Sequence, residues 1–356
     1  SYYIEPRTTG KENPKPVTAY FIRRMLLVIP TFIGITLLVF VLTRLVPGGP
    51  IERMMTEMQL AQEGVSQMQQ GPERGGVLNP AQLASLEAYY GFDQPIALAY
   101  VRWLGNVLTL DLGRSTRYNE PVWDIIAERL PISLYYGLTT LVLTYLVCIP
   151  LGIAKALKHG EGFDHSSSAI VFIGYAVPGY IVGIALLTAF ASELEIFPLG
   201  GFTSERFEEF TLIEQVQDIL WHSVLPLISY MLGSFAVMTF MMKNSLMDQL
   251  AQDYVRTALA KGLSFKDAVW KHAVRNSLIP LATHFGNNIS VILSGSFLIE
   301  TVFNINGFGL LGYESLLERD YPVVMGILVI SSLLFLIGNI LSDLCVAAVD
   351  PRVRFE

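Results

Sequence analysis

The residues best placed to do chemistry in this sequence lie in one charged block, residues 253–280, which separates two long apolar runs. The block and one lysine just before it supply six of the chain's 24 lysines and arginines: Lys243, Arg256, Lys261, Lys266, Lys271 and Arg275. Charge keeps such a block out of a bilayer, and basic charge is typical of the cytoplasmic side. The chemistry open to it is therefore contact with a soluble partner.

The block predicts a compact helical element. Residues 254–261 favour a helix, and Gly262 is suited to end that helix in a left-handed cap. Ser264 is then placed to cap a second helix over residues 265–275. Such an element protrudes from the membrane and fits a groove on a partner. An ordinary amphipathic loop is compatible with the same residues, and the pattern alone leaves both interpretations open.

A polar stripe follows in the next apolar run. Thr283, Asn287, Ser290 and Ser294 are spaced as i, i+4, i+7 and i+11, which places them on one helical face, and Glu300 lies near the outer end of that run. Polar groups within a span face the bundle interior or a water-filled cavity. These five residues are therefore candidates for lining a substrate path. Small polar residues also pack helices together, and the spacing fits both roles.

No motif for nucleotide binding or catalysis is found in the sequence. The phosphate-binding loop requires G-x-x-x-x-G-K-[ST], but Gly10-Lys11 is followed by Glu12, and Glu5 stands where the first glycine belongs. The patterns G-x-S-x-G, H-E-x-x-H and C-x-x-C are absent as well. We therefore expect a chain that is not an enzyme and holds no cofactor or metal.

The composition indicates a membrane protein. Hydrophobic residues make up 52% of the chain and charged residues 15%, with a mean hydropathy of +0.47, whereas soluble domains carry about 25% charged residues. The net charge of −7 argues against nucleic acid as a partner, because nucleic-acid binding needs a basic stripe. Membrane lipid is the expected surrounding.

Six apolar runs are long enough to cross a bilayer, which takes roughly 20 helical residues. They are residues 25–43, 132–154, 169–191, 223–242, 278–299 and 323–346. The predicted fold class is thus an all-α polytopic membrane protein with six transmembrane helices. The expected divisions are a tail (1–24), a first transmembrane helix (25–43), an extracytoplasmic loop region (44–131), a five-helix core (132–349) that contains a cytoplasmic loop (243–277), and a C-terminal tail (350–356).

The distribution of lysine and arginine predicts the orientation. With the N-terminus inside, the inside loops contain Lys155, Lys158 and the charged block, while the short outside loops carry only Arg206 and Arg319. Both termini are therefore expected in the cytoplasm.

The first outside loop, residues 44–131, is too long for a plain connection and should have its own structure or a partner. Apolar residues recur in it at helical spacing: Ile96, Tyr100, Leu104, Val107 and Leu108. This spacing predicts a helix that lies along the membrane surface or packs on the transmembrane bundle, and the pattern does not decide between the two.

The segment Arg256-Thr257-Ala258-Leu259-Ala260-Lys261-Gly262 resembles the permease signature of bacterial ABC importers, E-A-A-x-x-x-G, in the R-T-A-x-A-K-G form of the peptide branch. One departure is that Val274-Arg275 stands where the general motif has Leu-Pro. The resemblance to dipeptide and oligopeptide permeases, the Yej-type branch above all, covers nearly the whole chain. It includes the stretches 23–24, 111–115, 295–301, 307–314 and 349–356.

This resemblance implies a type I, MetI-like permease in a bacterial inner membrane. It implies pairing with a second homologous permease subunit, two ABC ATPase subunits or one fused tandem ATPase that bind ATP and Mg, and an extracytoplasmic peptide-binding protein. The implied substrates are peptides, with microcin C-like peptides as one candidate class. The implied ATPase-coupling residues are Tyr254, Arg256, Thr257, Ala258, Lys261, Gly262 and Ser264.

A secondary peptide transporter driven by an ion gradient is the alternative. That class shows an internal repeat and ionisable residues at mid-membrane. The sequence shows no repeat, and Glu300 and Asp343 fall near the ends of their runs.

Overall fold

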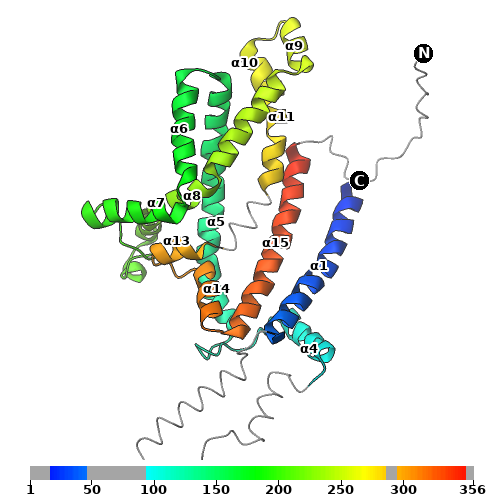
Figure 1. Ribbon diagram of the computed structural model, residues 1–356, viewed down its shortest axis with the longest axis vertical. Coiled ribbons are helices and arrows are strands. Elements are labelled where there is room, and N and C mark those ends of the chain that lie inside the picture. Colours follow the sequence, from blue (N-terminus) through cyan, green and yellow to red (C-terminus); the bar gives the residue numbers. More distant parts are fainter. Residues whose placement is uncertain (1–16, 46–93, 286–294, 350–356) are drawn as a thin grey trace, which may run out of the picture.

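The computed structural model describes residues 17–45, 94–285 and 295–349, and these residues are almost entirely helical (Figure 1). The α-helices are α1 (Val17–Leu45), α4 (Ile96–Leu108), α5 (Val122–Leu157), α6 (Gly162–Ala176), α7 (Gly179–Leu186), α8 (Leu212–Leu250), α9 (Asp253–Ala260), α10 (Phe265–Ala268), α11 (Val274–Ser277), α13 (Phe297–Val302), α14 (Phe308–Leu317) and α15 (Tyr321–Val349). There are also two π-helices, η1 (Leu187–Glu193) and η3 (Val269–Ala273), and a 3-10 turn, η2 (Phe207–Glu209). The predicted all-α class is confirmed.

Three of the described helices are long and apolar enough to cross a membrane: α5, α8 and α15. Helix α1 contains a shorter apolar stretch, Met25–Val41. These four correspond to the first, second, fourth and sixth predicted spans. The fifth predicted span, 278–299, begins as the helical stretch 279–285 but continues into residues 286–294, which lie outside the described part of the chain.

Helices α5 and α8 are longer than the apolar runs that predicted them. α5 begins at Val122, ahead of the expected residue 132, and its first turns bury Ile125 and Ile126. α8 begins at Leu212, and the carboxylate of Glu214 accepts a hydrogen bond of 2.8 Å from the main-chain N–H of Thr211, just before the helix. The predicted loops on both sides of these helices are correspondingly shorter.

The third predicted span, 169–191, is not one straight helix. α6 ends at Ala176, and the segment Gly179–Glu193 turns away from it by 96°. Pro178 explains the break, because proline lacks an N–H and forces the preceding residue, here Val177 (φ −101°, ψ 124°), out of the helical region. The run 169–191 is therefore divided at Pro178 into the end of α6 and the segment Gly179–Glu193.

After the bend, α7 crosses α8 at very close range. Gly179 and Gly183 occupy the crossing, and a Cβ added to Gly179 would lie 2.4 Å from the main-chain oxygen of Ser229. At Gly183 the added Cβ would lie 3.0 Å from the Ser229 hydroxyl. Small residues four positions apart allow helices to approach in this way. The crossing therefore depends on the absence of a side chain at these two positions of α7.

Helix α4 has the bounds that its apolar spacing predicted. Tyr100 is buried, and its hydroxyl donates to the main-chain oxygen of Ile33 at 3.1 Å and lies 2.9 Å from Thr36 Oγ1. Val101, on another side of the helix, is exposed. In the structure α4 is held against α1 by these contacts.

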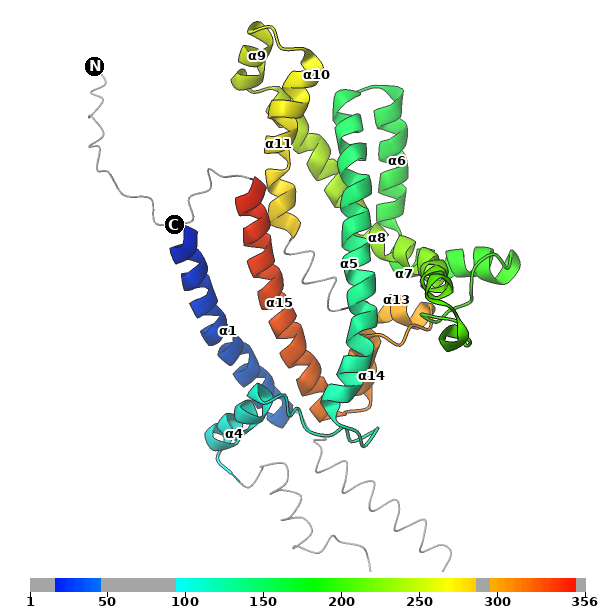
Figure 2. The same ribbon diagram turned by 180° about the vertical axis from the view of Figure 1, so that it is seen from behind.

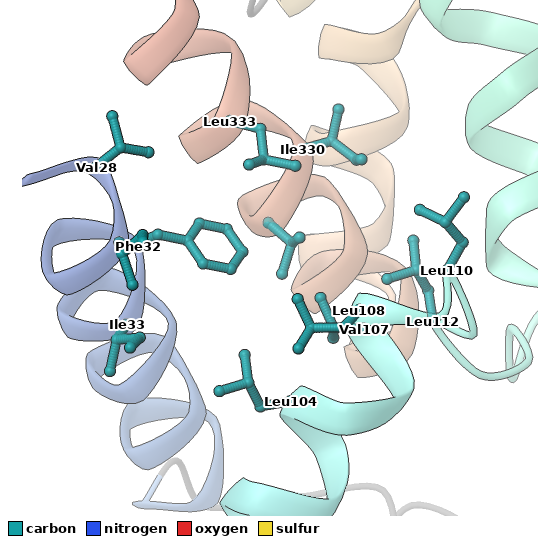
Figure 3. A pocket seen from close by; sticks show the side chains of 12 residues that line it. Val28, Phe32, Ile33, Leu104, Val107, Leu108, Leu110, Leu112, Ile330 and Leu333 are labelled. Atoms are coloured by element: carbon teal, nitrogen blue, oxygen red, sulfur yellow. The ribbon is translucent and has the colours of Figure 1, made fainter. Parts of the chain in front are cut away.

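An apolar groove lies where α1, α4 and α15 meet (Figure 3). Its volume is about 400 Å³, and Phe32, Leu104 and Ile330 point into it among other apolar side chains. The side chains that line it carry no polar atom.

The loop before α5 is fastened to the start of α15 by hydrogen bonds. Ser115 donates to the carboxylate of Asp320, which also accepts from the main-chain N–H groups of Thr116 and Arg117. Arg117 adds an ion pair of 2.8 Å to Glu318. This clamp lies at the end of the bundle opposite to α9, whereas α1 begins and α15 ends toward the α9 end (Figures 1 and 2).

Candidate functional site

The predicted helical element is present and protrudes at one end of the bundle (Figure 1). α9 closes with a complete Schellman motif: the N–H of Gly262 donates to the Leu259 oxygen at 2.9 Å, and that of Leu263 to the Ala258 oxygen at 3.2 Å. Gly262 has φ +90°, in the left-handed region that glycine adopts at no steric cost. The predicted left-handed cap is confirmed.

The second helix of the element starts at the predicted residue. Ser264 caps α10: its Oγ accepts from the Asp267 N–H at 3.1 Å and donates to Asp267 Oδ2 at 2.6 Å. The Ser264 hydroxyl and, after it, the Lys271 ammonium hold the pKa of Asp267 below its usual value. The helix then passes through the π turn η3 into α11, so the expected helix over 265–275 is present with one wider turn.

The exposed face of the element combines positive charge with large apolar side chains. Arg256, Thr257, Lys261 and Ser264 are exposed, as predicted for residues that meet a partner. Exposed apolar groups accompany them: Leu259, Phe265 and Trp270. A surface of this composition suits a protein partner, because apolar side chains supply the contact area and the basic groups supply direction.

Two of the predicted coupling residues, Ala258 and Tyr254, make contacts within their own chain. Ala258 is buried, so it supports the element rather than contacting a partner. The hydroxyl of Tyr254 donates to Gln249 Oε1 at 2.8 Å and accepts from Asn276 Nδ2 at 3.2 Å. Tyr254 therefore ties α9 to the end of α8 and to α11.

The element rests on a hydrophobic core that it shares with the transmembrane helices. Buried residues of α9, among them Val255, pack in one cluster with Ile153 of α5 and with Met242 and Leu246 of α8. Residues of α10 and η3, such as Ala268 and Val269, belong to the same cluster. A displacement of the element must therefore displace α5 and α8 with it, because close-packed interiors transmit strain.

The polar stripe is described in part. Thr283 is exposed, its hydroxyl donates to the Ile279 oxygen at 3.2 Å, and its own main-chain oxygen accepts from Ser342 at 3.1 Å. Asn287, Ser290 and Ser294 lie outside the described residues. Their place along a path stays a prediction.

Glu300 does not line an open path in this structure. Its side chain is fully buried, and its carboxylate accepts from Ser133 Oγ at 2.9 Å, from Tyr230 Oη at 3.4 Å and from the Leu310 N–H at 2.6 Å. A Cβ on Gly307 would lie 2.5 Å from the Glu300 carboxyl carbon. The carboxylate is a structural acceptor that joins α5, α8 and the first turn of α14.

The buried position of Lys243 was not predicted from the sequence, which placed this residue in the cytoplasmic loop 243–277. Lys243 is buried in α8 and pairs with Asp164 at 2.7 Å. Neither the spacing of these residues nor the local pattern predicts this contact. Among the residues that the structure describes, no group of three or more His, Cys, Asp or Glu side chains is arranged to hold a metal ion.

Comparison with known proteins identifies the relatives of this chain. The family model of the binding-protein-dependent transport system inner membrane component matches residues 148–355. The chain is 39% identical over 360 residues to the inner membrane ABC transporter permease protein YejB of Escherichia coli O157:H7, covering 95% of this chain and 99% of that protein. It is 38% identical over 358 residues to the peptidoglycan transport system permease protein YejB of Agrobacterium fabrum, covering 95% and 98%. It is 34% identical over 340 residues to the oligopeptide transport system permease protein AppB of Bacillus subtilis, covering 95% and 100%.

Among solved structures, a chain of the MetNI methionine ABC transporter in inward-facing conformations matches with a TM-score of 0.50 and 16% identity, covering 64% of this chain and 96% of that chain. At this identity the match shows the fold alone, and it confirms the predicted MetI-like architecture. The curated relatives are named as permease proteins, and this chain aligns with almost their whole length. These relatives confirm the prediction of a non-catalytic permease subunit. The chain belongs to the family of inner membrane components of binding-protein-dependent transport systems.

Proposed function

We propose that this chain is a permease subunit of an ATP-driven importer of peptides. The observation that carries the proposal is the exposed α9–Gly262–α10 element, which presents the R-T-A-x-A-K-G segment at one end of the bundle. The names of the relatives, which include peptidoglycan and oligopeptide transport permeases, support peptides as the substrate class. Microcin C-like peptides are a narrower candidate within that class.

The proposed mechanism couples ATP hydrolysis to the membrane helices through α9. Separate ATPase subunits, two copies or one fused tandem chain, bind ATP and Mg and contact Arg256, Thr257, Lys261 and Ser264. When the ATPases close, they displace α9. The shared core of Val255 with α5 and α8 carries that displacement into the spans.

The proposed orientation places α9 and both termini in the cytoplasm of a bacterium with the chain in the inner membrane. Support comes from the basic residues of the element and from the place of the helix ends, since α1 begins and α15 ends toward the α9 end (Figure 2). The clamp of Ser115 and Asp320 then faces outward. An extracytoplasmic peptide-binding protein delivers cargo on that side.

A second, homologous permease is proposed to complete the transport path. The stripe of Thr283, Asn287, Ser290 and Ser294 is our candidate for the lining contributed by this chain. Thr283 is exposed in the isolated subunit, as a path-lining residue must be. Weak, spaced polar contacts suit a path, because a transporter must release what it carries.

The test is gentle purification from the native membrane, followed by an assay of peptide-stimulated ATP hydrolysis. We expect ATPase subunits to co-purify, and substitution of Lys261 by glutamate to abolish the stimulation. Glu128→Lys serves as a control, because this residue of α5 is exposed at the opposite end of the bundle. A lone chain without ATPase, with peptide uptake driven by a proton gradient, would overturn the proposal in favour of a secondary transporter.

A further inference from the structure

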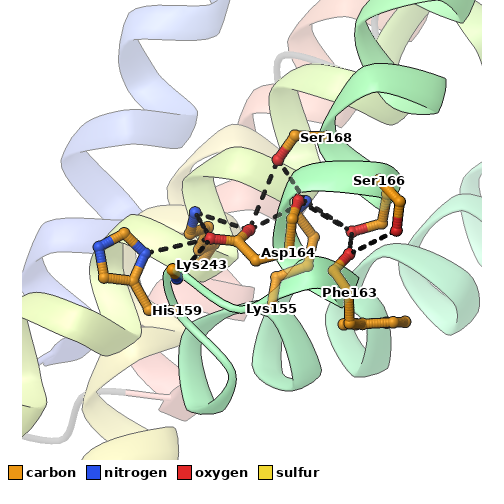
Figure 4. A network of polar contacts seen from close by, with 9 residues as sticks. Lys155, His159, Phe163, Asp164, Ser166, Ser168 and Lys243 are labelled. Atoms are coloured by element: carbon orange, nitrogen blue, oxygen red, sulfur yellow. Dashed lines mark hydrogen bonds and ion pairs between the residues drawn. The ribbon is translucent and has the colours of Figure 1, made fainter.

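A buried cluster of charged residues joins α5, α6 and α8 (Figure 4). Asp164, in the first turn of α6, accepts from Lys243 of α8 at 2.8 Å on one carboxylate oxygen and 2.7 Å on the other. Lys155, in the last turn of α5, lies 3.2 Å from the same carboxylate. The three side chains are 4%, 10% and 0% exposed, respectively. One carboxylate is thus shared by two buried ammonium groups from two helices.

The hydrogen-bonding capacity of Lys155 is completely used. Its three ammonium donors meet the Asp164 main-chain oxygen at 3.1 Å, Ser167 Oγ at 2.9 Å and Ser168 Oγ at 2.7 Å. The ammonium also lies 5.2 Å from the centre of the Phe240 ring of α8. Because every donor has an acceptor, Lys155 has no free donor for a ligand, and its role is to bind α5 to α6.

At the edge of the cluster, Asp164 contacts the loop between α5 and α6. The Gly160 N–H donates to Asp164 Oδ2 at 3.2 Å, and His159 Nδ1 lies 3.1 Å from the same oxygen. The His159 side chain is 55% exposed, so it marks the solvent boundary. The carboxylate is therefore enclosed on the inside by lysines and on the outside by the loop.

The cluster lies close to the element along α8. Lys243 stands between Met242 and Leu246, two fully buried residues of the core under α9. α8 ends at Leu250 and α9 begins at Asp253. The same segment of α8 therefore holds the element through apolar contacts and α6 through an ion pair.

We infer that Asp164 is a positioning residue that makes the start of α6 move together with the end of α8. A displacement of α9 then reaches α6 and, beyond the bend at Pro178, the crossing helix α7. Without the ion pair, α8 would respond to the element while α6 lagged behind. The inference rests on the proposed function, because it supplies a route for the proposed ATP-driven motion.

The decisive variant is Lys243→Met in the assembled complex. It removes the ion pair between α8 and α6, while the ring contact of Phe172 with Phe240 remains. It leaves Lys155 and Asp164 as a mutually neutral pair, so no buried charge loses its partner. We expect assembly to persist and the peptide imported per ATP hydrolysed to fall about tenfold, within the range typical of coupling between sites. Ser166→Ala is the matched control, since this hydroxyl bonds only the Phe163 oxygen of its own helix.

A distance measurement separates positioning from a purely structural role. Spin labels at His165→Cys on α6 and Asp248→Cys on α8, with both native cysteines replaced by alanine, report the separation of the two helices. We expect one narrow distribution with and without ATP in the parent complex, and a distribution that broadens on ATP addition in Lys243→Met. If Lys243→Met keeps both the narrow distribution and the parental uptake per ATP, the inference is wrong.

Asp164→Asn is the second variant, and we expect it too to lower the peptide imported per ATP hydrolysed and to broaden the distance distribution. Lys243→Arg, which keeps the positive charge, should show the parental uptake per ATP and the parental distance distribution. A parent complex that shows no peptide-stimulated ATP hydrolysis would contradict the proposed function itself. A parent complex that couples normally, together with a Lys243→Met complex that does the same, would contradict the positioning role alone.

Discussion

Replacing Gly262 with valine tests the cap of α9 directly. Gly262 has φ +90°, and a Cβ at this position would meet no atom within 4 Å. The cost therefore arises from backbone conformation and not from a clash. A residue with a Cβ loses about 1–2 kcal/mol in the left-handed region, and the stiffness of β-branched side chains places valine toward the upper value. That energy lowers the ratio of closed to open cap roughly 5- to 30-fold.

The assay is amide hydrogen exchange over the α9–α10 segment, run alongside peptide uptake. We expect the amides of Gly262 and Leu263, which close the cap, to exchange roughly 5- to 30-fold faster, and ATPase assembly or coupling to weaken. Gly113→Val is the matched control, since Gly113 has φ +83° and an equally open Cβ position in the loop before α5. Exchange rates and uptake in Gly262→Val equal to those of the parent would refute the cap assignment. If Gly113→Val speeds exchange in α9–α10 and lowers uptake as much as Gly262→Val does, the local role of the Gly262 cap is refuted.

Two further predictions concern the α7 crossing and the second helix of the element. Gly179→Ala should lower the free energy of unfolding by about 1–3 kcal/mol, because the new Cβ would lie 2.4 Å from the Ser229 oxygen. Thermal melting measures this loss. Gly105→Ala is the control and should show no such loss, because its Cβ position is open. The pKa of Asp267 is lowered chiefly by the Ser264 hydroxyl. The contribution of the ionised Asp267 carboxylate to stability is therefore complete above the ordinary aspartate pKa and is lost as the pH falls through the lowered value. The protection factors of the α10 amides, that is, their exchange rates relative to the intrinsic rate at the same pH, should therefore fall on acidification. Ser264→Ala should raise the pKa of Asp267 in a carbon NMR titration, and an unchanged titration would contradict the cap.

The features that the sequence predicts well are those whose causes are local. α4 has the bounds of its apolar spacing, Ile96–Leu108. The cap at Gly262 and the helix start at Ser264 also appear where they were expected. A glycine cap, a serine cap and an apolar face each act within one or two turns, so a single sequence contains all the information that they need.

Other features depend on residues that are far apart in the chain. The apolar run did not predict the start of α5, because Asp124, Glu128 and Arg129 lower the mean hydropathy of residues 122–131. Val122 in the first turn is nevertheless fully buried. Glu300 was assigned to the path, yet its acceptor role depends on donors from α5, α8 and the first turn of α14. Tertiary contacts decide both cases, and no local pattern encodes them.

The buried charge cluster also implies an order of events during synthesis of the chain. Lys155 and Asp164 are nine residues apart, so they can pair as soon as the α5–α6 hairpin has been made. Lys243 follows Asp164 by 79 residues, which corresponds to roughly 4–16 s at a ribosomal rate of about 5–20 residues per second. During this interval the hairpin carries a carboxylate that its own lysine already neutralises, and an ionised group is far less costly near a bilayer when it is paired. α8 then packs onto a hairpin in which Lys155 and Asp164 already form a neutral pair. The later ion pair of Lys243 with Asp164 joins this hairpin to the segment of α8 that leads into α9.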